Sequence, residues 1–183
     1  MSRILAISGS LRRASTTAAV LAAAVRLAPE DMLITIYRGL GELPLFNPDL
    51  EGGAFPDTVA DLRGMVDRSD GLLICSPEYA RGVAGAMKNA LDWLVGGHEF
   101  PGKPVAVVNA SQRSTDADAH LRLTLVTMSA RLVERASITL PLLGTGYGAD
   151  EIVADARFAE PLSAALVELA DDVGRITMRG AGT

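Results

Sequence analysis

Cysteine and histidine are scarce in this chain of 183 residues, which contains one cysteine and two histidines. The single cysteine, Cys75, allows no internal disulfide, and His98 and His120 lack both metal-ligand spacing and a neighbouring cysteine cluster. We therefore expect no disulfide framework, no metal site and no Cys–His or Ser–His catalytic pair. Cys75 ends an apolar run, which is typical of a small residue buried in a strand.

Long hydrophobic runs and clusters of basic residues are absent as well. The apolar runs are too short to cross a bilayer, and the chain begins with a short strand-like pattern instead of a signal peptide. A net charge of −5 without a basic run argues against duplex DNA or an acidic membrane surface as a partner. We expect a cytoplasmic protein that binds a small anionic ligand, with neither a nucleic-acid nor a membrane partner.

The sequence does contain a regular alternation of two hydrophobic patterns. Continuous apolar runs predict buried parallel strands at Arg3–Ile7, Leu33–Tyr37, Gly71–Cys75, Pro104–Val108 and Glu134–Leu140. Apolar positions three and four residues apart predict helices at Ser15–Leu27, Asp57–Ser69, Gly85–Val95, Ala117–Arg131 and Arg157–Met178. Five successive strand–helix units in a chain of this length indicate one α/β domain over residues 1–183, a doubly wound three-layer sandwich.

Two segments carry no such pattern. Gly39–Ala54 is rich in Gly, Pro, Asn and Asp and is expected to be a long surface loop. The last five residues, 179–183, are expected to fray.

The turn Ser8–Thr17, with the sequence SGSLRRASTT, lies between the first predicted strand and the first helix. Unpaired amides and the positive end of the helix dipole make a helix N-terminus a site for phosphate, and hydroxyls and an arginine can join them. This turn therefore predicts a binding site for a phosphorylated ligand. A second interpretation stays open: Ser15 or Thr16 can cap the helix without any ligand.

The segment Ser76–Gly82, with the sequence SPEYARG, follows the third predicted strand. In an open parallel sheet, ligands bind at the carboxyl ends of the strands where the winding direction reverses, so this turn and the first should face one crevice. Pro77 restricts the backbone on both sides of it, which helps to aim the amides that follow into that crevice. Such amides can bind the polar edge of a flat heterocycle.

SGSLRRAS at residues 8–15 and PEYARGVAGAMKNALDWL at residues 77–94 together resemble the NAD(P)H-dependent FMN reductase family of flavodoxin-like quinone, azo and chromate reductases. The resemblance covers essentially the whole chain and implies a flavodoxin-like five-stranded parallel sheet of order 2-1-3-4-5. It also implies bound FMN, NAD(P)H as the reductant, and a small acceptor such as a quinone, an azo compound, chromate or free flavin. A homodimer or homotetramer is expected by the same resemblance.

The resemblance assigns two groups of binding residues. It implies that the FMN phosphate is bound by Ser10, Arg12, Ser15, Thr16 and Thr17. It implies that the isoalloxazine ring contacts Pro77, Glu78, Tyr79 and Ala80. Ser111, just beyond the fourth predicted strand, is a further candidate for the far side of the crevice. No side chain is required as a catalytic acid or base, because the cofactor carries the redox chemistry, and ping-pong kinetics are expected.

The chain departs from the family pattern at four positions. The family usually has Asn at the position of Thr17, and Asn, Ser and Pro at the positions of Ala80, Gly82 and Ala84. The hydroxyl of Thr17 can still donate a hydrogen bond to a phosphate, whereas Ala80 has no polar side chain and can contribute only its backbone. The departures therefore bear on the nicotinamide and acceptor side of the pocket.

Several alternatives remain open from the sequence. Tyr79 either contacts the flavin or packs on the next helix, Ser111 either lines the crevice or belongs to a solvated loop, and Lys88 pairs either with Asp92 or across a subunit boundary. Gly144–Gly148 is interpreted as a flexible rim, because no strong helix follows it at once. A flavodoxin-like electron shuttle without nicotinamide activity is the alternative function, and a flavin-free regulatory descendant is a third.

Overall fold

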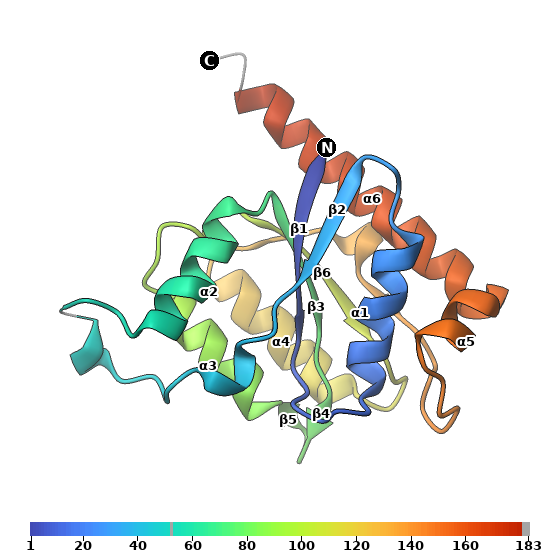
Figure 1. The fold of residues 1–183 in the computed structure, drawn as a ribbon, viewed down its shortest axis with the longest axis horizontal. Coiled ribbons are helices and arrows are strands. Elements are labelled where there is room, and N and C mark those ends of the chain that lie inside the picture. Colours follow the sequence, from blue (N-terminus) through green and yellow to red (C-terminus); the bar gives the residue numbers. More distant parts are fainter. Residues whose placement is uncertain (52, 181–183) are drawn as a thin grey trace.

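A computed structural model describes residues 1–51 and 53–180, with only the helical backbone given for 176–180 (Figure 1). It is an α/β sandwich whose central sheet has the strand order β2-β1-β3-β6-β7. The short strands β7 and β8 both pair with β6, β7 at its start and β8 at its end. All pairings in this sheet are parallel. The strands are β1 (Ser2–Ser8), β2 (Met32–Ile36), β3 (Gly71–Cys75), β6 (Pro104–Asn109), β7 (Arg131–Leu132) and β8 (Ile138–Thr139).

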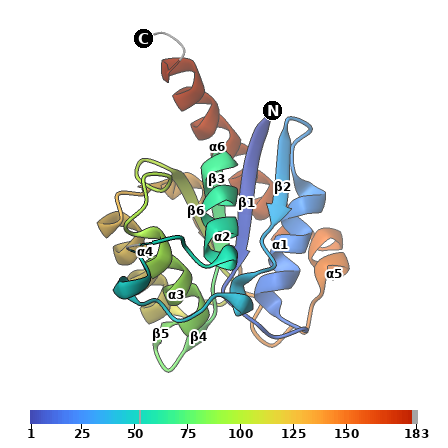
Figure 2. The ribbon, with the colours of Figure 1, turned by 60° about the vertical axis from the view of Figure 1, so that its left-hand side comes forward.

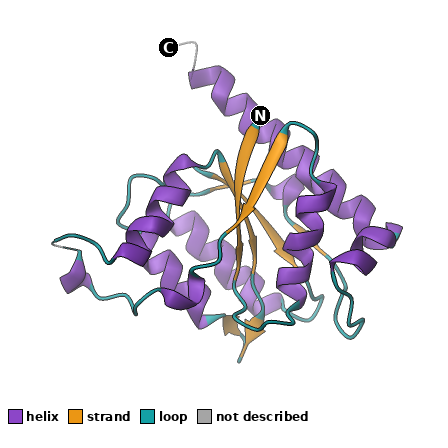
Figure 3. Ribbon diagram, viewed as in Figure 1, coloured by secondary structure: helices purple, strands orange, loops and turns teal. Residues whose placement is uncertain are grey.

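Helices cover both faces of the sheet, as Figures 2 and 3 show. The helices are α1 (Thr16–Leu27), α2 (Asp57–Arg68), α3 (Gly85–Leu94), α4 (Thr115–Thr127), α5 (Ala149–Ala154) and α6 (Ala156–Gly180). Side chains of α1, α5 and α6 share one hydrophobic core with one face of the strands. Side chains of α2, α3 and α4 form a second core with the opposite face.

Alternation along the strands separates the two cores. In β3 every residue is buried, with Leu73 and Cys75 in the first core and Leu72 and Ile74 in the second. Successive side chains of a strand point to opposite faces, so a strand covered on both sides needs an unbroken apolar run. The predicted parallel sheet with helices on both faces is confirmed, and its strand order agrees in kind with the expected 2-1-3-4-5.

The predicted fifth strand is confirmed only at Ile138–Thr139, which form β8, and is wrong at its start. Between β7 and β8 the chain forms a short 3-10 turn at Glu134–Ala136, where a continuous strand was expected over Glu134–Leu140. Helix α4 also ends earlier than predicted, at Thr127, because Arg131 already pairs with Pro104 as part of β7.

The long loop after β2 is more ordered than a surface loop. Two 3-10 turns, at Leu40–Glu42 and Pro48–Leu50, lie within it, and Leu40 and Leu43 are buried in the second core. The carbonyl of Pro44 accepts hydrogen bonds from the side chains of two α3 residues. Residue 52 of this loop lies outside the described residues.

The C-terminal region also differs from expectation. Residues 179 and 180, expected to fray, belong to α6, and residues 181–183 lie outside the described part of the chain. Within the residues that the structure covers, no helix combines the length and the apolarity needed to span a bilayer.

Candidate functional site

The carboxyl ends of β1 and β3 lie side by side, and they bring the two predicted binding turns together (Figure 1). Ser8 is the register partner of Cys75, and the amide of Gly9 donates to the carbonyl of Cys75 at 2.9 Å. The backbone of Gly9 then passes directly against Ser76. A Cβ atom added to Gly9 would lie 2.4 Å from Ser76 Oγ and 2.9 Å from Ser76 Cβ, closer than real contacts allow. Only glycine permits this approach of the two turns.

Side-chain hydroxyls hold the first turn together. The Thr17 hydroxyl lies 2.9 Å from that of Ser8 and 2.7 Å from that of Ser15, and Thr17 is buried. Ser15 is also the N-cap of α1, since its side chain accepts from the amide of Ala18 at 3.4 Å. Ser15 is thus the cap of α1, and its contact with a phosphate stays a prediction. The Thr17 hydroxyl is engaged within the turn, and its role as a phosphate ligand stays a prediction.

The first turn leaves its donors and cations open. Thr16 and Thr17 are the first residues of α1, so their amides have no acceptor within the helix. Arg12 and Arg13 are exposed and form no ion pair with any residue that the structure describes. Both arginines, with Ser15 and Thr16, line a hollow of about 530 Å³ that is closed on its other side by residues 146–148. Positive charge, free amides and hydroxyls thus meet at one helix N-terminus, which favours a phosphate.

The second turn is a β-hairpin that the sequence did not predict. Strands β4 (Glu78–Tyr79) and β5 (Gly82–Val83) pair antiparallel, with Ala80 and Arg81 as the two-residue loop. Both loop residues have positive φ, 50° and 60°, as in a type I′ turn. This geometry favours Asn-Gly, so Ala-Arg gave no hairpin signal, and the left-handed backbone of Ala80 and Arg81 is strained.

Two polar contacts anchor this hairpin to the start of α4. The carboxylate of Glu78 accepts from the amide of Ala117 at 2.9 Å, and the guanidinium of Arg81 pairs with Asp116 at 3.1 Å. Glu78 therefore satisfies an amide in the first turn of α4 that has no partner within the helix. Tyr79 is half exposed, and its contact with a flavin ring stays a prediction.

A crevice of about 210 Å³ lies between the ends of β1, β3 and β6. It is lined by predicted residues from three loops: Thr16, Thr17, Pro77, Glu78 and Ser111. The crevice and the hollow beside Arg12 share Thr16 and Gly146, so the two spaces adjoin.

The wall beyond β6 is built around Asn109. The Asn109 side chain accepts from the amide of Ser111 at 3.1 Å and donates to the carbonyl of Ser114 at 3.0 Å. This buried amide orders the loop that brings Ser111 to the crevice, so Ser111 lines the crevice and does not lie in a wholly solvated loop.

The remaining predicted residues lie next to these spaces but do not line them. The Ser10 hydroxyl accepts from the amide of Arg12 at 3.3 Å, which shapes the first turn. Tyr79 and Ala80 form the outer part of the hairpin. Which of the predicted residues touch a bound ligand stays a prediction for all of them.

Sequence reasoning missed several residues of the crevice. Ser76, Asn109, Ser114, Leu142 and Leu143 contribute to its walls, together with Gly144 and Gly146 of the predicted rim. The segment Gly144–Gly148 is followed directly by α5, a helix of only six residues. Asn109, the polar last residue of the buried strand β6, was an available signal, since ligands bind at strand carboxyl ends.

Other chemistries find no support in the described residues. No group of three or more His, Cys, Asp or Glu side chains in the described part of the chain is arranged to bind a metal ion. Cys75 is fully buried, and burial raises the pKa of its thiol, so the reactive thiolate is disfavoured. Lys88 pairs with Asp92 on its own helix.

Comparison with known proteins agrees with this geometry. Residues 2–142 match the family described as NADPH-dependent FMN reductase. The chain belongs to this family. It is 33% identical to the NAD(P)H-dependent FMN reductase of Pseudomonas aeruginosa over 163 residues, which cover 86% of this chain and 88% of that protein. It is 31% identical to the quinone reductase of Escherichia coli K12 over 139 residues, covering 73% and 74% of the two chains.

A solved structure shows the same arrangement of elements. The chain is similar to FerB, a flavoenzyme NAD(P)H:(acceptor) oxidoreductase of Paracoccus denitrificans, with a TM-score of 0.75 and 25% sequence identity. The match covers 93% of this chain and 98% of that one. Family membership confirms the prediction of an oxidoreductase, with FMN and a reduced nicotinamide as the cofactors of the family.

The residues present fit FMN by their chemistry. A phosphate monoester matches the free amides of α1 beside Arg12 and Arg13, which have no ion-pair partner among the described residues. A flat ring system matches the crevice that adjoins this hollow and is bounded by Pro77 and Ser111. The two turns lie close enough for one ligand to contact both, since Gly9 touches Ser76.

Proposed function

We propose that this protein is an FMN-dependent NAD(P)H oxidoreductase that passes two electrons from a reduced nicotinamide to a small acceptor of the quinone type. The observation that carries the proposal is the close approach of Gly9 to Ser76, which supports one ligand spanning both turns. Relatives named quinone reductase in Escherichia coli and Pseudomonas putida favour a quinone over the other acceptors.

The first turn would hold the phosphate end of the cofactor. Arg12 supplies a charge-assisted hydrogen bond that no described carboxylate competes for, and the amides of Thr16 and Thr17 supply further donors. Ser8, Ser15 and Thr17 hold one another through their hydroxyls, so the turn is formed before the ligand arrives. A preformed site loses less conformational entropy on binding.

The second turn would position the ring. Glu78 and Arg81 tie the hairpin to α4, which fixes the direction of the amides that follow Pro77. When bound, FMN supplies the two-electron chemistry, accepting a hydride from the nicotinamide and reducing the acceptor. The protein contributes binding, orientation and fixed donors beside the ring, and no side chain of the crevice is assigned as a proton donor or acceptor.

Anaerobic spectroscopy of the purified protein tests this function. FMN is added and the visible spectrum of the bound flavin recorded, then NADH or NADPH is added without oxygen, followed by a benzoquinone. The proposal predicts bleaching by a reduced nicotinamide and return of the absorbance on addition of the quinone. Parallel lines in double-reciprocal plots of steady-state rates are expected, because donor and acceptor compete for one exposed face.

Three results would separate the alternatives. Flavin that binds but is not bleached by either nucleotide points to an electron shuttle. No uptake of FMN at saturating concentration points to a flavin-free protein. If only an azo compound or chromate restores the absorbance after bleaching, the protein is a reductase whose acceptor is not a quinone.

A further inference from the structure

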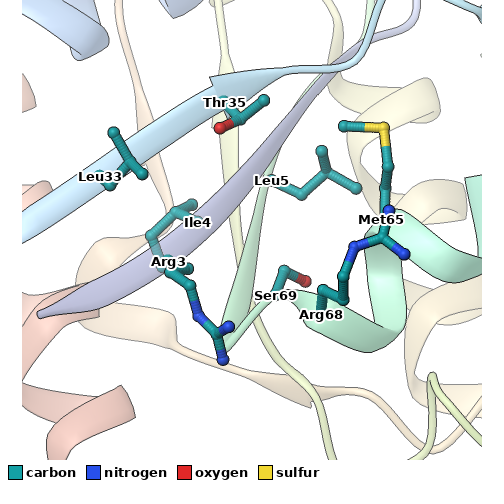
Figure 4. A pocket seen from close by; sticks show the side chains of 8 residues that line it. All are labelled: Arg3, Ile4, Leu5, Leu33, Thr35, Met65, Arg68 and Ser69. Carbon is teal, nitrogen blue, oxygen red and sulfur yellow. The ribbon is translucent and has the colours of Figure 1, made fainter.

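A hollow of about 240 Å³ opens between β1, β2 and α2, away from the two binding turns. This β2–α2 hollow is lined by the eight residues that Figure 4 labels. It reaches Arg3 and Ser69, near the amino ends of β1 and β3, whereas the crevice lies at the carboxyl ends of the strands. It shares no lining residue with the crevice or with the hollow beside Arg12.

The β2–α2 hollow exists because α2 packs on β1, while β2 lies at the margin of the sheet. On the other face of β2, Met32 and Ile34 are buried in the core that includes α1. On the face of the hollow, Leu33 is 48% exposed and Thr35 is exposed. Leu33 therefore leaves apolar surface in contact with water, and a ligand that covers it is favoured by the hydrophobic effect.

The lining is apolar where β2 faces α2. Figure 4 shows Leu33 on one side and Met65 on the other, with the buried Leu5 between them. The thioether of a methionine makes favourable contacts with aromatic rings. An apolar cavity of about 150 Å³ is large enough to hold benzene, so the size and the lining of this hollow suit an aromatic ring system.

Arg68 brings a positive charge to the edge of the hollow. It is exposed and forms no ion pair with any residue that the structure describes. A Cβ added to Gly64 would lie 3.0 Å from Arg68 Nη1, so the side chain runs back along α2, away from the helix C-terminus that repels anions. None of the described residues that line the hollow is acidic.

Arg3, the other cation of the lining, is already engaged. Its Nη2 and Nε atoms donate to the two carboxylate oxygens of Asp70 at 3.0 and 3.2 Å, and its backbone amide donates to Asp70 Oδ2 at 2.8 Å. The charge of Arg3 is therefore balanced within the fold, and that of Arg68 remains for a ligand. One guanidinium balances one negative charge, and its planar fork matches a carboxylate through two hydrogen bonds.

We propose that the β2–α2 hollow is a second ligand site, separate from the crevice, that binds a small aromatic carboxylate. The ring lies on Leu5, Leu33 and Met65, and the carboxylate pairs with the guanidinium of Arg68. A phosphate dianion is disfavoured there, because its second charge would find no free cation in the lining. This site does not depend on FMN or on the proposed function.

Methyl NMR with 2-naphthoate as the probe tests the site directly. The methionine methyl groups are isotopically labelled, and Met65→Leu assigns the signal of Met65. The ring of the probe is expected to shift this signal saturably, with a Kd of about 1 mM or lower. The signal of Met87, which is fully buried in the second core, should stay in place.

The titration is made with and without saturating FMN. A flat probe can also enter the crevice, and bound FMN competes with it there. The shift of the Met65 signal is expected to be the same in both titrations, so the result does not depend on whether the proposed function is correct.

Variants and an uncharged probe test the contacts. Arg68→Gln is expected to weaken the binding of 2-naphthoate about tenfold or more. The alcohol 2-naphthalenemethanol, which has the same rings and no charge, should bind Arg68→Gln and the natural chain alike. Arg38→Gln removes an exposed arginine outside the hollow and is the matched control. Leu33→Ser should weaken the binding of both probes, because it removes apolar surface that the rings cover.

Three results would overturn the proposal. The first is a Met65 signal that does not move up to the solubility limit of 2-naphthoate. The second is an equal affinity of Arg68→Gln and the natural chain for 2-naphthoate, since the carboxylate would then not pair with Arg68. The third is an equal affinity of the natural chain for 2-naphthoate and for the alcohol, which would leave an apolar hollow without recognition of an anion.

Discussion

The turns that follow β1 and β3 lie against each other, yet they are held in different ways. The first is held by hydroxyls, and its cations Arg12 and Arg13 have no partner among the described residues. In the second, the charged side chains Glu78 and Arg81 are both engaged with the start of α4. Charge is thus available for a ligand at the first turn and is used internally at the second.

This difference indicates which part of a ligand each turn can bind. A phosphate needs uncommitted cations and amides, which the first turn offers at the N-terminus of α1. A neutral ring needs fixed backbone groups and a wall, which the anchored hairpin offers at the cost of two left-handed residues. Substitutions in the first turn should therefore weaken ligand binding, whereas substitutions in the second turn should lower the stability of the fold.

The largest effect is expected where the turns touch. Gly9→Ala forces a Cβ against Ser76 and should destabilise the fold by about 1–3 kcal/mol, as thermal unfolding measures, and weaken FMN binding. Adding Ser76→Gly removes the obstructing atoms and should restore most of both losses. Gly85→Ala is the matched control, since a Cβ there meets nothing within 4 Å. Equal behaviour of Gly9→Ala and Gly85→Ala would contradict the close approach.

Removing a cation from the first turn should affect binding alone. Arg12→Ala is expected to weaken FMN affinity about 10- to 100-fold, the value of a lost charge-assisted hydrogen bond, with little change in the unfolding temperature. Riboflavin, which lacks the phosphate, should bind the variant and the natural protein alike. Arg13 lies in the same hollow, and Arg13→Ala should weaken FMN affinity less than Arg12→Ala does. If Arg13→Ala weakened it more, the phosphate contact would belong to Arg13 instead of Arg12.

Removing a carboxylate from the second turn should affect stability first. Glu78→Ala leaves the amide of Ala117 without its acceptor and is expected to cost about 1 kcal/mol. Glu78→Gln keeps an acceptor oxygen and should retain most of that stability. The comparison is made by urea unfolding of the protein without FMN, and an equal loss in both variants would show that charge, not the hydrogen bond, matters there.

The smallest effect is expected from relief of strain at the hairpin tip. Ala80→Gly removes a left-handed penalty of about 1–2 kcal/mol and adds a glycine entropy cost of about 0.5–1 kcal/mol, so the net gain lies between about 0 and 1.5 kcal/mol and is centred near about 0.75 kcal/mol. The unfolding temperature should therefore rise slightly. Ala22→Gly within α1 should lower it, and a fall in both variants would argue against strain at Ala80.

The elements that the sequence predicted well are those whose burial is unambiguous. Strand β3 was predicted with its observed bounds, because all its residues are apolar and both its faces are covered. Glu134–Leu140 contains Glu134, Arg135, Ser137 and Thr139 among its apolar residues, and only Ile138–Thr139 forms a strand, β8, because Glu134–Ala136 turns before it. A short segment of mixed polar and apolar residues therefore predicts a strand less well than the unbroken apolar run of β3.

The sequence predicted which loops form the site, but it did not predict their backbone conformation or their hydrogen bonds. The hairpin was missed because Ala80 and Arg81 adopt a turn that favours Asn-Gly, and tertiary contacts to α4 hold it there. Thr17 was expected to face a phosphate, while its hydroxyl contacts two neighbouring serines. Such hydrogen bonds depend on how the turn closes against β1, which no spacing in the sequence specifies.

Hydrogen exchange with two ligands tests most directly whether one FMN contacts both turns. Amide exchange is measured for the free protein, with FMN, and with riboflavin at matched saturation. The account predicts that FMN slows exchange in both residues 8–17 and residues 76–83, whereas riboflavin slows it in residues 76–83 alone. Protection of only one turn by FMN, or equal protection of both turns by riboflavin, would contradict it.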